Sequence, residues 1–171
     1  MINLLGSEKL KTYPLSYMAC LVDYIGKNYD ATILFNYFPK QIEEASIIYN
    51  ECSDVTKNKI RFELLGNDLR EFIAIMNNCD LIIGNDGGAV NMAKALDKPS
   101  FIIFSPWIEK KIWATFEDGI NHTSVHLNDY HQEYFKKKSY DDLKDEALEL
   151  YEKFSPELIL QKLNLFLTHH L

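Results

Sequence analysis

Residues 80–106, DLIIGNDGGAVNMAKALDKPSFIIFSP, contain the pattern that decides the fold. The apolar run Leu81–Gly84 predicts a buried strand, and the small apolar residues of 89–96 predict a helix that begins beside two glycines. Residues 100–104 predict a further strand. A strand, a helix and a second strand in this order are typical of a parallel sheet, so the stretch indicates an α/β fold.

The turn between the first strand and the helix is a candidate anion-binding site. The first amides of a helix and the positive end of its dipole suit a phosphate, and Gly87 and Gly88 would let ligand oxygens approach the backbone. Asp86 would lie at the rim of the same crevice, outside the carboxyl ends of the strands. The alternative is that the glycines only make the turn, as Asp-Gly often does. The turn has neither the GxGxxG nor the Lys-Ser/Thr ending of known phosphate loops, so both interpretations stay open.

The rest of the chain continues the alternation. We expect one domain over residues 1–171, a Rossmann-like three-layer α/β/α fold with a mainly parallel sheet. Further strands are predicted at residues 2–5, 31–35, 60–64 and 124–127, and further helices from Pro14, after Pro39, from a cap at Asn67 or Asp68, at about 140–154 and at about 156–169.

The composition limits the classes of function. The 171 residues are 47% apolar, enough for an independent core. The net charge of −7 argues against a general nucleic-acid binder. The three cysteines show no CxxC spacing, so neither a disulfide framework nor a cysteine-rich zinc site is expected. We find no signal peptide and no membrane span, which predicts a cytoplasmic protein.

Lys9 and Lys11 are candidate phosphate contacts. They follow the first predicted strand, and the carboxyl ends of parallel strands share one edge, so both lysines would lie on the edge that carries Asp86. A lysine there meets a phosphate as a point charge. For either residue alone, a solvated loop lysine is the simpler interpretation.

Other chemistry-bearing residues give weaker signals. His122, His126 and His131 have no acidic partner at helical spacing, so no metal site is predicted. Trp107 and Trp113 would pack, or line a cleft wall. Two further weak candidates are Asp118, in a predicted turn, and His169-His170, at the chain end. No GxSxG elbow or cysteine-histidine signature is present, so no nucleophile is predicted.

Taken together, these motifs resemble the C-terminal half of glycosyltransferase family 9, the heptosyltransferase group, over nearly the whole length. Residues 86–91, Asp-Gly-Gly-Ala-Val-Asn, align with the family's Asp-Thr/Ser-Gly-x-x-His, and Lys98-Pro99 and Ser105-Pro106 follow in step. Residues 11–14, Lys-Thr-Tyr-Pro, are similar to the family's Lys-x-Trp-Pro.

The resemblance implies one half of a GT-B architecture that binds a nucleotide-sugar donor, ADP-heptose or a similar sugar. It implies an inverting transfer without a metal or other cofactor. On this analogy Lys11 and the amides of Gly87 and Gly88 contact the diphosphate, Asp86 contacts the sugar, and Asn91 stands where the family has histidine. The glycine at 87 lacks the usual hydroxyl, and Asn91 can hydrogen-bond but cannot titrate.

The resemblance also implies a missing partner half. The general base is expected in an N-terminal acceptor-binding half, and the chain opens on what resembles the second half's first strand. We therefore expect either a separated donor-binding domain or a truncated product, which catalyses no transfer alone. The full enzyme would act on lipopolysaccharide or another surface glycan at the inner face of the membrane. Whether the exposed docking face drives self-association stays open. The alternative is a non-catalytic α/β module that binds a nucleotide or a protein. The base, the sugar and the acceptor stay open.

Overall fold

The computed structural model describes residues 1–171 and contains a single sheet of six parallel strands, in the order β3-β2-β1-β4-β5-β6. The strands are β1 (Ile2–Asn3), β2 (Ile33–Asn36), β3 (Ile60–Arg61), β4 (Ile82–Asn85), β5 (Ser100–Ile103) and β6 (His122–Val125). The order reverses between the neighbours β1 and β4, where helices leave toward opposite faces and a crevice opens at the carboxyl ends. This arrangement confirms the predicted α/β fold with a parallel sheet.

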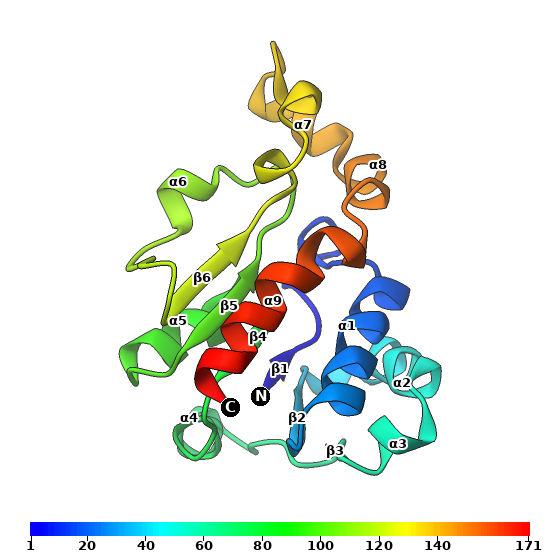
Figure 1. Ribbon diagram of the computed structural model, residues 1–171, viewed down its shortest axis with the longest axis vertical. Coiled ribbons are helices and arrows are strands. Elements are labelled where there is room, and N and C mark those ends of the chain that lie inside the picture. Colours follow the sequence, from blue (N-terminus) through cyan, green and yellow to red (C-terminus); the bar gives the residue numbers. More distant parts are fainter.

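Helices cover both faces of the sheet. They are α1 (Leu15–Asn28), α2 (Ile42–Glu51), α3 (Asp54–Lys57), α4 (Leu69–Asn77), α5 (Gly88–Ala95), α6 (Lys110–Trp113), α7 (Tyr140–Asp145), α8 (Ala147–Glu152) and α9 (Pro156–His170). Four 3-10 turns join them: η1 (Lys9–Lys11), η2 (Pro39–Gln41), η3 (Leu127–Asp129) and η4 (Gln132–Phe135). In Figure 1, α1 and α9 lie side by side on one face, and α5 lies behind the strands.

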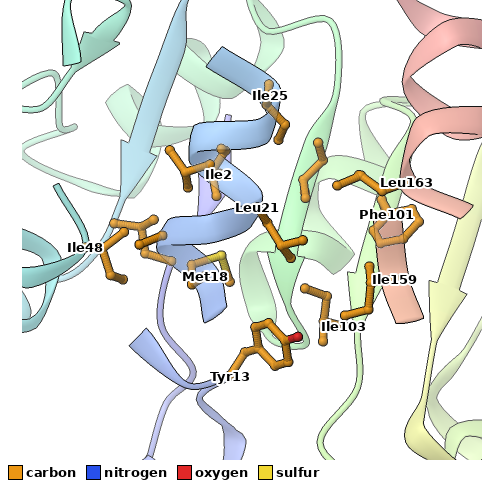
Figure 2. Close-up of a cluster of buried hydrophobic side chains, with 14 of the residues drawn as sticks. Ile2, Tyr13, Met18, Leu21, Ile25, Ile48, Phe101, Ile103, Ile159 and Leu163 are labelled. Carbon is orange, nitrogen blue, oxygen red and sulfur yellow. The ribbon is translucent and has the colours of Figure 1, made fainter. Parts of the chain in front are cut away.

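The central strands are buried on both faces, which explains their uninterrupted apolar sequence. Ile83 and Ile103 belong to the large core cluster beneath α1 and α9, whereas Ile82 and Ile102 belong to smaller clusters on the α4 and α5 side. Figure 2 shows the large cluster, where Tyr13 lies at one end of the side chains from α1 and α9. The alternation of neighbouring residues between the two faces follows from the pleat of the strand.

Several helix starts follow the predicted local chemistry. Asp68 caps α4, because its carboxylate accepts hydrogen bonds from the amides of Arg70 (2.8 Å) and Glu71 (2.9 Å). Pro14 immediately precedes α1, and Pro156 is the first residue of α9. The sequence pattern therefore located these three starts correctly.

Several sequence expectations differ from the structure. The strands expected at residues 2–5 and 60–64 are shorter, at Ile2–Asn3 and Ile60–Arg61. The helix expected at about 140–154 is two helices, because the chain breaks at Glu146, where ψ is 4°. After this break Ala147, Leu150 and Tyr151 turn into the core, whereas α7 has no buried residue. The last strand lies at His122–Val125, two residues earlier than 124–127, because its register is set by pairing with β5.

Two fully buried tyrosines give a matched test of the core. The Tyr13 hydroxyl donates a hydrogen bond of 2.6 Å to the carbonyl of Phe154, whereas the buried Tyr151 hydroxyl has no hydrogen-bond partner. We expect Tyr13→Phe to lower the free energy of unfolding by about 1 to 2 kcal/mol. Tyr151→Phe should leave it within about 0.5 kcal/mol of wild type or raise it, since no bond is lost. Urea denaturation of both variants checks this; equal losses would contradict the assigned hydrogen bonds.

Candidate functional site

The carboxyl end of β4 lies so close to β1 that it requires a glycine. Gly84 has φ +136°, and a Cβ built on it would lie 2.1 Å from the carbonyl oxygen of Asn3. Only glycine adopts this conformation readily and tolerates this approach. The close contact brings the loop after β1 and the turn after β4 together at the reversal point of the sheet.

Asn85, which follows, ties these two segments together. Its side chain is fully buried, accepts from the amide of Tyr13 (2.7 Å) and donates to the carbonyl of Leu4 (2.7 Å). Asn3 donates to the backbone carbonyl of Asn85 (2.8 Å) and accepts from Asn36 on β2 (2.8 Å). These buried amides hold the ends of β1, β2 and β4 in register. Sequence reasoning missed this network, since an asparagine beside a glycine turn is ordinary.

The segment after β5 positions Lys11. The Ser105 hydroxyl and the Trp107 indole N–H both donate to the carbonyl of Leu10, at 2.6 and 2.9 Å. The ammonium group of Lys11 lies 5.5 Å from the centre of the Trp107 ring. Lys11 is half-buried, whereas Lys9 in the same 3-10 turn is exposed. The structure therefore holds Lys11 beside Trp107, near enough for its charge to act on Asp86, and leaves Lys9 in solvent.

The glycine turn presents free backbone donors. Gly87 stands at the cap position of α5 with no side-chain hydrogen bond, and no acidic side chain occupies the first turn of the helix. The amides of Gly88, Ala89 and Val90 donate to no protein atom. A Cβ on Gly88 would meet nothing within 4 Å, and one on Gly87 would meet only the Asn3 amide at 4.0 Å. The protein itself does not need glycine at these two positions, so open space remains above the free amides.

A cavity of about 490 Å³ extends from this turn across the carboxyl ends of β1, β2 and β3. This volume suits a small ligand. Asp86, Gly87 and Gly88 line one end, and apolar side chains line much of the remainder. The principal lining residues away from the turn are Leu5, Asn36, Tyr37, Phe38, Pro39, Leu64, Leu65, Gly66, Asp68, Leu69, Phe72 and Met92.

Burial raises the pKa of Asp86 above its ordinary value, and the positive charges of Lys11 and Lys94 oppose this shift. The carboxylate makes no ion pair with either lysine. Asn91 is exposed on α5 and does not line the cavity. Of the five residues predicted for the donor site, three therefore line the cavity and two, Lys11 and Asn91, do not, although the charge of Lys11 acts on Asp86.

None of the weaker candidates lines this cavity. The Asp118 carboxylate accepts from the amides of Ile120 (2.9 Å) and His122 (2.8 Å) and so closes a turn. Trp107 is buried and Trp113 is exposed. His131 Nδ1 lies 3.0 Å from Glu133 on the surface. No group of three or more histidine, cysteine, aspartate or glutamate side chains converges as metal ligands would.

His126 is a buried neutral histidine. Its Nε2 donates to the carbonyl of Pro106 (3.1 Å), and its Nδ1 accepts from the amide of Asn128 (3.0 Å). Burial lowers the pKa of His126, and the nearby charge of Asp129 opposes this shift. Protonation would abolish the acceptor at Nδ1, so the fold favours the neutral ring.

This histidine predicts a pH dependence of stability. Because the folded pKa lies below the unfolded value of about 6.5, the contribution is fully present above that value and is lost as the pH falls through the folded pKa. We expect the melting temperature to fall between about pH 7 and pH 5, and the fall to be smaller in His126→Gln. Thermal melts at both pH values check this, with exposed His169→Gln as the control. An equal fall in wild type and His126→Gln would contradict the assignment.

A larger cavity, of about 630 Å³, lies at the opposite edge of the sheet. It is lined mostly by apolar side chains at the amino ends of the strands, and both Met1 and Leu171 line it. Figure 1 shows the two chain ends close together at this place. None of the residues predicted to bind the donor lies there, so we assign the candidate site to the carboxyl edge.

Comparison with known proteins gives consistent relatives. Residues 1–143 match the family model described as glycosyltransferase family 9 (heptosyltransferase). The chain is 31% identical over 112 residues to lipopolysaccharide heptosyltransferase 1 of Campylobacter coli, which covers 61% of this chain and 30% of that protein. It is also similar to the solved structure of E. coli ADP-heptose lps heptosyltransferase II, with a TM-score of 0.58 and 19% identity over 90% of this chain and 46% of that chain.

The chain thus spans less than half the length of each of these relatives. The structural similarity shows a common fold with part of the E. coli enzyme. No helix in the structure has the length and apolar character needed to cross a membrane.

Proposed function

This chain belongs to glycosyltransferase family 9, the heptosyltransferase family, and from that membership we propose that its glycine turn and the adjoining cavity bind a nucleotide-sugar donor. The observation that carries the proposal is the open space above Gly88, beside three backbone amides that donate to nothing. Free amides at a helix start and a nearby Lys11 are the groups that hold phosphate oxygens.

The long cavity suggests an order for the parts of the donor along the edge of the sheet. The diphosphate would lie at the glycine turn after β4, and the nucleoside would extend toward β2 and β3. There Phe38, Leu64 and Leu69 are 63%, 49% and 60% exposed, and all three line the cavity. Large apolar side chains that remain exposed beside a cavity suit the face of a nucleobase.

The sugar would lie on the other side of the diphosphate, near Asp86. Its carboxylate can accept hydrogen bonds from sugar hydroxyls, and Asn91 on the exposed face of α5 can donate and accept in the same region. Family membership makes a heptose the leading candidate for the sugar and a surface glycan such as lipopolysaccharide the candidate acceptor.

Transfer would proceed by attack of an acceptor hydroxyl oxygen on the anomeric carbon. The bond between that carbon and the phosphate oxygen breaks, and the electron pair leaves with the nucleoside diphosphate. Lys11 and the turn amides would stabilise this leaving group. We assign the acceptor site, and the base that takes the hydroxyl proton, to the other half of a GT-B enzyme. We propose that the complete enzyme acts in the cytoplasm at the inner face of the membrane. If that half does not act with this chain, the same cavity would serve a nucleotide-binding module without transfer activity.

Calorimetric titration with ADP tests donor binding. We expect wild type to bind ADP and Lys11→Ala to weaken the affinity roughly tenfold, because one charged phosphate contact is lost. Lys9→Ala is the matched control, since Lys9 belongs to the same 3-10 turn and is exposed. Absence of binding by folded wild type, or equal effects of the two alanine variants, would contradict the proposal.

A further inference from the structure

Trp107 stands at the centre of a cationic cluster that the donor site described above does not fully use. The indole is only 5% exposed, and its position is fixed by the hydrogen bond to Leu10. The ammonium group of Lys11 lies 5.5 Å from the ring centre, and that of Lys144, on α7, lies 5.2 Å from it. Two lysines from distant parts of the sequence therefore converge on one buried ring.

Neither ammonium group has a counter-ion. The ion pairs of the protein involve other lysines, and neither Lys11 nor Lys144 donates a side-chain hydrogen bond. Glu146, two residues after Lys144, is paired with Lys138. Both ammonium groups lie beside the same ring, and neither forms an ion pair. An anion bound between them would gain two charged partners.

The cluster adjoins the glycine turn. Trp107 packs in one apolar cluster with Val90, whose amide is one of the free donors, and with Ala147 at the start of α8. These features follow one another along the carboxyl edge of the sheet. The large part of the cavity lies over β1, β2 and β3, and the glycine turn follows β4. Trp107 comes after the next strand, β5. Figure 1 shows α7 beyond the carboxyl end of β6, on the same edge. The two lysines thus lie on the side of the turn that faces away from the nucleoside end.

We propose that Lys144 is a second phosphate-binding residue, which together with Lys11 holds the phosphate on the sugar side of a bound nucleoside diphosphate. This inference rests on the proposed donor function and adds a residue to it. The backbone amides of Gly88–Val90 would hold the phosphate attached to the nucleoside, and the two ammonium groups would hold the outer one. The outer phosphate carries the charge that develops when a sugar departs, so Lys144 would stabilise the leaving group as well as the ground state.

The comparison of ADP with AMP isolates this role, because AMP lacks the outer phosphate. We expect Lys144→Gln to weaken ADP binding roughly tenfold and to leave AMP binding unchanged. Lys153→Gln is the matched control, since Lys153 is exposed and unpaired at the end of α8. Unchanged melting temperatures would show that each variant is folded.

A tryptophan signal gives a second readout. Trp113, 56% exposed, can be replaced by phenylalanine so that Trp107 is the only tryptophan. In Trp113→Phe, ADP should change the Trp107 fluorescence as the ammonium groups turn from the ring to the phosphate, and AMP should change it much less. If wild type binds neither nucleotide, both the donor proposal and this one fail. If wild type binds both and Lys144→Gln weakens neither, or weakens both equally, the role of Lys144 alone is contradicted.

Discussion

Gly88→Val is expected to weaken ADP binding by at least about a hundredfold while the chain stays folded. A Cβ at residue 88 meets nothing within 4 Å, so the added side chain begins in open space and not against protein atoms. It would instead fill the space above the free amides of the first turn of α5, where the phosphate must approach. Loss of several charge-assisted hydrogen bonds to phosphate accounts for an effect of this size.

Two further variants define the cause of this loss. Gly88→Ala adds only the Cβ and should produce an intermediate loss of affinity. Ala95→Val, at the exposed opposite end of the same helix, should bind ADP as wild type does. Calorimetry gives the affinities and thermal melts give the folding of each variant. Binding by Gly88→Val at wild-type strength would place the ligand elsewhere.

The second large effect concerns the stability of the site. Asn85→Leu is expected to lower the free energy of unfolding by about 3 to 5 kcal/mol, because it leaves the buried amide of Tyr13 and the buried carbonyl of Leu4 without partners. The leucine also cannot reproduce the amide shape in a fully buried position. Urea denaturation measures the loss, with the exposed Asn91→Ala as the control that should change stability by less than about 0.5 kcal/mol.

Asn85→Asp separates shape from hydrogen bonding. The aspartate keeps the acceptor for Tyr13 but places a carboxylate oxygen against the carbonyl of Leu4, where wild type has a donor. We expect a destabilisation similar to that of Asn85→Leu. A wild-type stability for both variants would show that the buried amide network does not hold β1 and β4 together.

The core of the fold could be predicted from the sequence because its local signals agree. In residues 80–106 the apolar runs, the glycine turn and the helix start all favour one β-α-β unit, and the observed β4, α5 and β5 follow it closely. The position of Lys11 followed from a rule of geometry, namely that parallel strands end on one edge. The family resemblance drawn from these motifs is confirmed by the family model over residues 1–143.

What the sequence could not reveal depends on contacts between distant segments. The break at Glu146 has no proline or glycine to mark it and follows from the packing of Tyr151 and its neighbours into the core. Asn85 differs from a turn asparagine only through its partners on β1 and in the loop that follows. Lys144 belongs to no recognisable sequence motif, and only the fold places it beside Trp107. The contacts of Asn85 and Lys144 therefore needed the structure, whereas the fold class and the glycine turn did not.

The most direct test of the account is to follow the backbone amide resonances of the whole chain by NMR during titration with ADP. The account predicts saturable shifts at Gly87, Gly88, Ala89 and Val90, with further shifts along the cavity at Phe38 and Leu65. Shifts confined to the opposite edge of the sheet, around Cys79 and Leu81, or no shifts in a folded chain, would contradict donor binding at the glycine turn.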